Sequence, residues 1–343
     1  MRIKLFTLAV SLLLMMSGFF IVVSGNGISV EEDVSVSSSL ESLSGEGTED
    51  DPYLIYDVYD LQNMNDDLGA NYSLANDIDA SETEEWNGGK GFLPVGDENE
   101  SFSGTFDGNG YEIRGLYINR PETSYVGLFG AVSRGVIRDI GLVDTKVIGY
   151  AYVGSLMGLN VVSTVEKSYA TGTVTGDLSV GGLGGFLYNN SVVEYSYAIC
   201  DVSGNRSVGG LVGTSIGLVR NSYFVGEITG ESYLGGLIGK ESTYISIYPS
   251  VVRNSFWDRT ISGINRGSGT GLMTEEMTGL SAKENMTGFD FENTWDVYDN
   301  GTHVSYPYLI DNAQEPAPGL QHVDDIDYFL PVDPDTKSQP YRI

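Results

Sequence analysis

Hydrophobic and polar residues alternate along this chain in a pattern that repeats about every 27 residues. Short runs rich in Val, Ile and Tyr are broken by glycines, and a Gly-rich core recurs with steps of 27, 27, 28 and 26 residues. Self-similarity with a period between 20 and 50 residues is typical of stacked or radial repeat architectures. The cores begin at Val126, Val153, Val180, Val208 and Leu234.

The repeat has the composition of β-strands. It contains no apolar stripe with the period and length of a helix, and its β-branched and aromatic runs are typical of strands. The unit is shorter than the roughly 40 residues of a propeller blade, so one coil of a parallel β-helix fits better. We expect three short strands and three bends per coil. Five coils then make an all-β prism roughly 20–25 Å tall.

Certain residues occupy the same place in each unit. Paired glycines such as Gly209–Gly210 are expected at bends that need a positive φ, or where coils approach closely. Serines also recur, and a parallel stack puts equivalent residues of neighbouring coils one strand spacing apart. We therefore expect these serines to stack near a bend: Ser168, Ser196, Ser222 and Ser255.

A column of charges follows from the same alignment. Arg138, Glu166, Glu194, Arg220 and Arg253 share one position of the repeat. Two carboxylates about 5 Å apart match the separation in a retaining glycosidase. An outward ladder of ion pairs explains the same residues without catalysis, because flanking Arg residues would lower the pKa of the acid that a hydrolase must keep protonated. We favour the ladder, and the enzyme stays as the alternative.

The Gly-rich cores, written G-[GS]-L-x-G, and the NSYA-like segments that follow them resemble the GLUG motif of secreted, adhesin-like surface proteins of bacteria and archaea. The likeness covers roughly residues 46–311. Single coils depart from it at Ser155 and Gly184, and one core lacks a residue. The resemblance implies a right-handed β-helix on a cell surface and no settled biochemical activity.

The N-terminus has the pattern of an export signal. In residues 1–25, Arg2 and Lys4 precede the apolar run Leu5–Val23, and small residues follow at a plausible cleavage site. The apolar run is longer than usual, so an uncleaved membrane anchor stays open. Residues 26–47 are rich in Ser and acidic residues, which predicts a disordered linker.

Capping segments are expected at both ends of the stack, because bare strand edges promote aggregation. Residues 48–124 would form the N-terminal cap and first coils. There Asp57 should cap a short helix with Leu61, Met64 and Leu68 on one face.

The C-terminal side is divided in the same way. Residues 125–263 are the regular coils, with an insertion at Glu241–Ser250. Residues 264–311 would close the stack, and Ser281 with Glu284 predicts a capping box that opens a helix there. Residues 312–343 are expected to be a flexible tail.

The charge balance restricts the partners. The chain has 47 acidic and 18 basic residues and a net charge of −29. Such an excess repels nucleic acids and anionic headgroups, so contact with a membrane is expected only through an uncleaved anchor. The remaining partners are an extracellular glycan or another surface protein.

Few residues suggest cofactor or metal chemistry. The single cysteine, Cys200, aligns with glycines of neighbouring coils and is expected to be a buried thiol. The two histidines, His303 and His322, fall outside the repeats, so a zinc site or a catalytic triad is not expected. The turns at 76–79 and 107–110 are Asp-rich but lack the calcium-loop pattern, and tight turns explain them better. We expect no catalysis, no metal and no cofactor.

Six N-x-S/T sequons could carry glycans if the chain is exported in a glycosylating host. We therefore predict a secreted or cell-surface glycoprotein that serves as an adhesion, binding or structural module. The sequon residues are Asn71, Asn99, Asn189, Asn205, Asn285 and Asn300.

Overall fold

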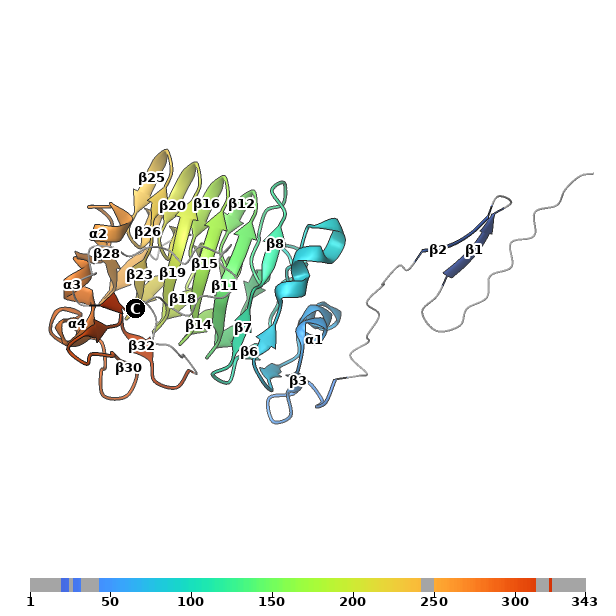
Figure 1. Ribbon diagram of the computed structural model, residues 1–343, viewed down its shortest axis with the longest axis horizontal. Helices are drawn as coiled ribbons and strands as arrows, with labels where there is room; N and C mark the ends of the chain where they lie inside the picture. Colours follow the sequence, from blue (N-terminus) through green and yellow to red (C-terminus); the bar gives the residue numbers. More distant parts are fainter. Residues whose placement is uncertain (1–19, 25–26, 32–42, 242–249, 313–320, 323–343) are drawn as a thin grey trace, which may run out of the picture.

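The computed structural model describes residues 20–24, 27–31, 43–241, 250–312 and 321–322. Its body is a parallel β-solenoid whose coils follow one another along the long axis (Figure 1). The expected all-β parallel β-helix is therefore confirmed. Most of the predicted signal segment, linker, insertion and tail lies outside the described residues.

The strands of the solenoid form four parallel sheets. Sheet 1 contains β3 (Tyr53–Ile55), β4 (Tyr72–Leu74), β6 (Thr105–Asp107), β10 (Val136–Arg138), β14 (Thr164–Glu166), β18 (Val192–Glu194), β22 (Leu218–Arg220) and β27 (Val251–Arg253). Sheet 2 contains β5 (Ile78–Asp79), β7 (Glu112–Arg114), β8 (Tyr117–Asn119), β11 (Gly141–Ile148), β15 (Tyr169–Thr175), β19 (Tyr197–Ser203), β23 (Tyr223–Val225), β24 (Ile228–Thr229), β28 (Phe256–Asp258) and β29 (Thr270–Leu272).

The two smaller sheets are built from the Gly-rich cores. Sheet 3 contains β12 (Ala151–Val153), β16 (Leu178–Gly181), β20 (Arg206–Gly209) and β25 (Ser232–Gly235). Sheet 4 contains β9 (Phe129–Ser133), β13 (Met157–Val161), β17 (Gly184–Tyr188), β21 (Val212–Ser215) and β26 (Ile238–Glu241).

Each regular coil has four strands, not the three expected. The difference arises in the Gly-rich core, which supplies two strands instead of one bend: β16 ends at Gly181 and β17 begins at Gly184. Between them, Leu183 is fully buried. The chain therefore turns at the glycine pair and sends one apolar side chain inward at each turn.

The paired glycines are required because neighbouring coils approach them closely. The other expected reason, a positive φ at the bend, is wrong for these residues. None of them has a positive φ. A Cβ on Gly210 would lie 2.2 Å from the Phe224 ring and 2.4 Å from the carbonyl oxygen of Gly236 in the next coil. The positive φ values, between 55° and 60°, belong to a neighbouring column of non-glycine residues: Tyr152, Ser179, Ser207 and Tyr233.

The serine column forms the stack that the period predicts. The Ser168 N–H donates to Ser196 Oγ at 3.2 Å, and the Ser196 and Ser222 N–H groups donate in turn to Ser222 and Ser255 at 3.1 and 3.2 Å. Each hydroxyl donates to the carbonyl two residues earlier, as Ser196 does to Glu194 at 2.7 Å. These buried polar groups satisfy each other, as polar groups taken out of water must.

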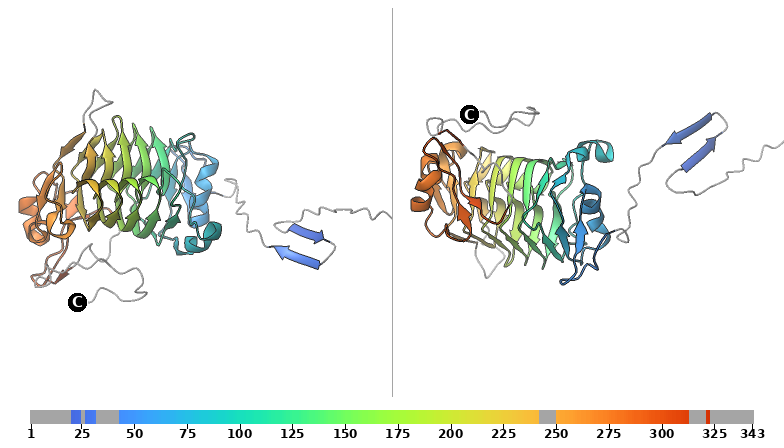
Figure 2. Two further views of the ribbon diagram at one scale, coloured as in Figure 1. Left: turned by 90° about the horizontal axis from the view of Figure 1, so that it is seen from above. Right: turned by 60° about the horizontal axis from the view of Figure 1, so that its bottom comes forward.

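The N-terminal end is closed by helices (Figure 2). The helix α1 (Val58–Asn63) begins at Asp57, whose carboxylate accepts the N–H groups of Tyr59 and Asp60, so the predicted cap is confirmed. Leu61 and Met64 are fully buried. Two 3₁₀ helices follow: η2 (Met64–Asp66) and η3 (Ser81–Gly88).

Residues 274–312, which we call the C-terminal strap, follow the last coil. After α2 (Arg259–Ser262), β29 adds to sheet 2. The strap then packs along the outer side of the coils, where its aromatic residues cover a column of tyrosines. Its elements are α3 (Thr274–Met277), α4 (Gly279–Asn285), β30 (Trp295–Asp296), β31 (His303–Val304) and β32 (Tyr308–Leu309).

The predicted capping box at Ser281 and Glu284 is wrong. Helix α4 begins at Gly279, so Ser281 lies inside it. A contact of this kind occurs instead at the start of the preceding helix, α3, where the Glu276 carboxylate accepts the N–H of Met273 at 2.7 Å. Outside the solenoid, β1 (Phe20–Ser24) pairs with β2 (Gly27–Glu31), and β31 pairs with β33 (Gln321–His322). Among the helices that the structure describes, none is long and apolar enough to cross a membrane.

Candidate functional site

The predicted charge column is present at the end of the sheet 1 strands. Parallel pairing places Arg138 opposite Glu166, Glu166 opposite Glu194, and Glu194 opposite Arg220, with Arg253 next. The column extends one coil further to Asp107, the register partner of Arg138. Sequence alignment of the Gly-rich cores missed Asp107 because it precedes the first core.

The ion pairs do not run continuously along the charge column, as a simple ladder would. Arg138 binds Asp107, with Nη2 and Oδ2 2.8 Å apart, and Arg220 binds Glu194 at 2.5 Å. No ion pair to Glu166 occurs within the described part of the chain. Glu194 is only 8% exposed, so its carboxylate depends on the Arg220 guanidinium for compensation. The column therefore consists of two separate pairs with Glu166 between them.

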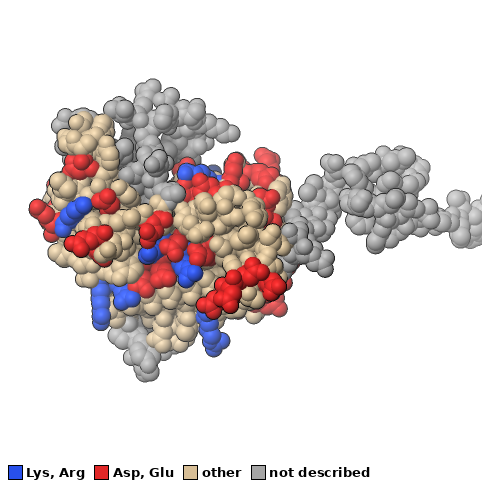
Figure 3. All heavy atoms as spheres, turned by 90° about the horizontal axis from the view of Figure 1, so that it is seen from below, with Lys and Arg blue, Asp and Glu red and all other residues tan. Residues whose placement is uncertain are grey.

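The far end of the C-terminal strap lies beside this column. Lys167 Nζ binds Asp311 Oδ2 at 2.9 Å, and the Asn312 side chain donates to the Lys167 carbonyl. The hydrogen bond to Asp311 raises the pKa of Lys167, whereas burial raises the pKa of the Asp139 carboxyl. Figure 3 shows acidic and basic side chains side by side on the face seen from below. A mixed arrangement of this kind is typical of a structural charge network.

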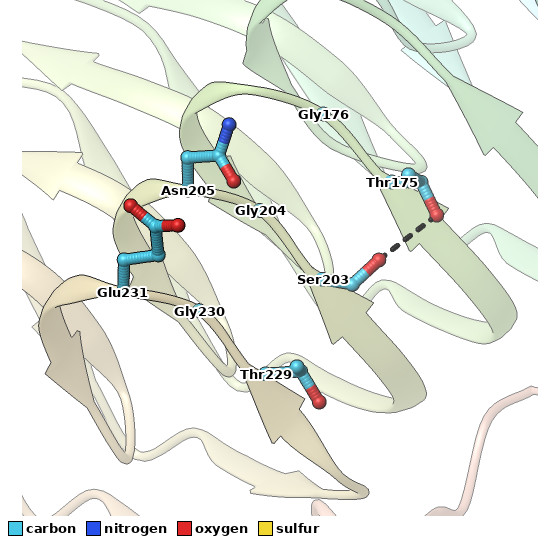
Figure 4. Close-up of a pocket in the computed structure, with 8 residues that line it drawn as sticks. All are labelled: Thr175, Gly176, Ser203, Gly204, Asn205, Thr229, Gly230 and Glu231. Atoms are coloured by element: carbon cyan, nitrogen blue, oxygen red, sulfur yellow. Dashed lines mark hydrogen bonds between the residues drawn. The ribbon is translucent and has the colours of Figure 1, made fainter.

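A polar groove lies elsewhere, at the bend between sheets 2 and 3. One wall is a row of hydroxyls from successive coils, Thr175, Ser203 and Thr229, and a glycine follows each of them. Asn205 and Glu231 stand on the other side of the glycines (Figure 4). The Thr175 and Ser203 hydroxyls are 3.0 Å apart and hydrogen-bonded. The sequence signal for this groove is the repeated tripeptide TGD, SGN and TGE, which lies outside the charge column and was not predicted as a binding site.

The remaining candidates for chemistry serve structure. Cys200 is 2% exposed and its thiol contacts the Ala170 carbonyl, and burial raises its pKa, which disfavours the reactive thiolate. His303 and His322 are backbone register partners in β31 and β33. In the described ranges, no cluster of three His, Cys, Asp or Glu side chains could hold a metal ion.

The Asp-rich turns are also structural. Asp107 accepts the Asn109 N–H at 2.8 Å in the turn that joins β6 to β7, and its other oxygen binds Arg138. Asp77 accepts the Glu112 N–H, and Asp79 accepts the Ser81 N–H, each at 2.9 Å. Hydrogen bonds from Ser81 lower the pKa of Asp79. The Asp79 and Asp107 carboxylates thus stabilise their turns, whereas Asp77 links its turn to the next coil.

The sequons occupy different environments. Asn99, Asn205 and Asn300 are exposed, whereas Asn71, Asn189 and Asn285 are partly buried. Some side chains are already bonded: Asn71 Oδ1 accepts the Thr105 N–H, and Asn285 Nδ2 donates to Ser281. Asn205 Nδ2 donates to the Asp177 carboxylate. Attachment of a glycan at any of the six stays a prediction.

Two known proteins share sequence with this chain. Halomucin of Haloquadratum walsbyi is 36% identical over 174 residues, a match that covers 48% of this chain and 2% of halomucin. The "Putative Gly-rich membrane protein" of Evansella cellulosilytica is 39% identical over 122 residues, which cover 34% of this chain and 14% of that protein. The chain is thus homologous to short segments of much longer proteins. No known family profile matches it.

The fold is also found among solved structures. A "putative immunoglobulin A1 protease" from Bacteroides ovatus superposes with a TM-score of 0.55 at 19% sequence identity. The superposition covers 78% of this chain and 95% of that one. At this identity the likeness establishes the β-solenoid and says nothing about activity.

Proposed function

We propose that this chain is an exported β-helix of the cell surface that acts as a binding or structural module and catalyses no reaction. Its homology to halomucin and to a Gly-rich membrane protein supports the surface location. The GLUG-like cores support the same location. The net charge of −29 favours an extracellular glycan or another surface protein as partner over a nucleic acid.

The ion pair between Glu194 and Arg220 is the observation that most supports a non-catalytic role. A retaining hydrolase needs one carboxyl of its pair to stay protonated as the general acid. Glu194 is buried, and one of its carboxylate oxygens is already bound by the Arg220 guanidinium 2.5 Å away. One member of the best-placed pair of carboxylates is thus engaged in an ion pair, which supports a structural ladder over a catalytic acid.

A carbohydrate-active enzyme remains the second candidate for one reason. Glu166 and Glu194 are direct register partners on adjacent strands, which gives the short separation of a retaining pair. Glu166 also has no ion pair in the described part of the chain and is available to act as a nucleophile.

One experiment separates these two functions. The purified full-length chain is incubated with a panel of polysaccharides while both binding and product release are recorded. Selective binding without cleavage supports the module. Cleavage that disappears in the folded double variant Glu166→Gln with Glu194→Gln establishes the enzyme instead.

The location is tested in the native host. We expect surface proteolysis of intact cells to remove the protein, and mass spectrometry to find a mature chain that begins near Asn26, or one that retains its N-terminus as an anchor. A protein that is protected inside intact cells would contradict export. Mass spectrometry of the same material shows which of the six sequons carry glycans.

A further inference from the structure

The groove between sheets 2 and 3 presents polar groups from every coil. The row of Asn205 and Glu231 continues on the preceding coils to Asp177 and Tyr150, because backbone hydrogen bonds link the four in order. The N–H of each donates to the carbonyl of the one before it, at 2.7 Å for Asp177, 3.0 Å for Asn205 and 3.1 Å for Glu231. Tyr150, at the head of the row, is 44% exposed. The wall thus presents a phenol, a carboxylate, an amide and a second carboxylate in line.

The floor of the groove is bare backbone. A Cβ on Gly176 would point inward and lie 2.9 Å from methyl groups of Val153 and Val180. Gly204 and Gly230 are confined by the same kind of contact with core side chains. The chain therefore sinks toward the core between the two walls, and a ligand can approach the backbone closely.

The groups on both walls suit an uncharged ligand with many hydroxyls. The opposite wall is a row of hydroxyls, and Thr229 and Thr175 are exposed. The lining residues include Glu231 but no Lys or Arg. The Arg206 guanidinium, in the adjoining column, lies over the ring of Tyr233 at 5.1 Å. An anionic chain would thus meet carboxylates without a compensating cation.

We propose that this groove binds a linear, neutral glycan that lies parallel to the solenoid axis. The proposal rests on the proposed role as a surface binding module and names its ligand class. Successive coils place one polar side chain on each wall about every 4.8 Å, which is close to the length of one pyranose unit in an extended chain. Each coil then meets one sugar unit. The exposed phenol ring of Tyr150 offers a surface on which a sugar ring can pack.

Calorimetric titration of the full-length chain tests the proposal. The protein is produced in a host that adds no N-glycans, so that Asn205 in the wall stays bare. The ligands are neutral β- and α-linked glucose and mannose oligosaccharides from two to six units long. We expect affinity for at least one series to rise with length up to about four units, one for each residue of the wall, and then level off.

Matched variants assign the binding to the groove. Thr175→Val with Thr229→Val removes two hydroxyls at constant shape and should weaken binding about tenfold. Thr173→Val changes the same strand outside the groove and should leave affinity unchanged. The melting temperatures of both proteins are measured to confirm folding.

The outcomes separate this inference from the function on which it rests. Binding that ignores the double variant, no binding by any neutral series, or binding only of an anionic polysaccharide in the presence of Ca²⁺ overturns the groove assignment. None of these results affects surface location, which proteolysis of intact cells decides independently. Cleavage of a bound neutral glycan would instead refute the non-catalytic role while preserving the ligand class.

Discussion

The regular coils and the C-terminal strap are held in place by different kinds of contact. In the coils, equivalent residues of successive units touch, as the rings of Tyr169, Tyr197 and Tyr223 do at centroid distances of 4.9 and 4.8 Å. The strap makes unlike contacts between residues far apart in sequence. The Tyr223 hydroxyl donates to the Pro307 carbonyl at 2.6 Å across 84 residues.

This difference shows that the solenoid has two cores with separate origins. The lumen is lined by columns of aliphatic residues, whereas the second core forms where Phe289, Trp295 and Tyr306 of the strap cover the outer tyrosines. Errors in a coil propagate to its neighbours, because every unit templates the next. A defect in the strap should instead expose one face and leave the coils stacked.

The largest expected effect comes from disturbing the coils at Gly210. Gly210→Ala puts a methyl group 2.2 Å from the Phe224 ring and 2.4 Å from a backbone carbonyl of the next coil, which cannot move without opening the stack. We expect the free energy of unfolding to fall by about 3 kcal/mol, measured by urea denaturation. Gly69→Ala is the control, because its new Cβ would have no neighbour closer than 3.5 Å. Equal stability of the two variants would show that coil spacing at Gly210 is adjustable.

A somewhat smaller effect is expected when the strap is released at Asp258. This fully buried carboxylate accepts the hydroxyls of Tyr306 and Thr274, each at 2.7 Å, and two backbone N–H groups. Asp258→Asn replaces one hydrogen-bond acceptor with a donor and should lower the free energy of unfolding by about 2 kcal/mol.

Hydrogen exchange locates the damage caused by Asp258→Asn. Amides of residues 274–312 should exchange faster, while those of the sheet 1 strands keep their protection. Tyr306→Phe is the milder companion, because it removes only one of the four hydrogen bonds. Uniform loss of protection through the coils would contradict the separation into two cores.

Stability should increase at Asn160, a polar residue in the lumen. It is fully buried, and neither atom of its amide has a hydrogen-bond partner among the described residues. Its register partners are Val132 and Leu187. Asn160→Leu should therefore raise the free energy of unfolding by about 1 kcal/mol, which is measured as a higher melting temperature.

The control for Asn160→Leu is a buried Asn that is bonded. Asn221 Oδ1 accepts the Asn254 amide at 3.2 Å, and its φ is 49°, so Asn221→Leu should destabilise the chain. A lower melting temperature for Asn160→Leu would mean that its amide binds internal water that the apolar side chain displaces.

The smallest effect is expected from the charge column on the outside of the coils. Glu166→Gln with Glu194→Gln should change the free energy of unfolding by about 1 kcal/mol or less, with most of the loss from Glu194 because it has the ion pair. Denaturation at low and high salt measures the two single variants. If Glu166→Gln alone costs as much as Glu194→Gln, the column acts as one network and not as separate pairs.

Features that recur in every repeat could be predicted from the sequence. The period sets the register between coils, and the register predicts both the serine stack, which includes Ser168 and Ser196, and the charge column. Contacts that have no equivalent in the next repeat could not be predicted in this way. Arg138 forms its ion pair with Asp107, which precedes the aligned repeats, and Asp258 accepts a hydrogen bond from Tyr306, 48 residues away.

Backbone conformation was the second limit. In the Gly-rich cores, positive φ values fall on Tyr152 and Tyr233, residues that tolerate them poorly, whereas the paired glycines adopt ordinary angles. The paired glycines are needed because the neighbouring coil is close, and a single sequence cannot distinguish this need from a need for conformational freedom. Because the role of the glycines was ambiguous, neither the fourth strand of each coil nor the groove at the TGD, SGN and TGE tripeptides was predicted.

The return of the strap along the coils has a mechanical consequence. Its far end is fixed beside Lys167 and close to Gly110, well before the last coil. Tension applied between the N-terminal cap and Asn312 would therefore enter the coils near Lys167, and the later coils would carry no load until the strap detaches. Since the strap lies along the axis, its contacts are loaded in shear and must fail together. Resistance to pulling would depend on the barrier to that single event.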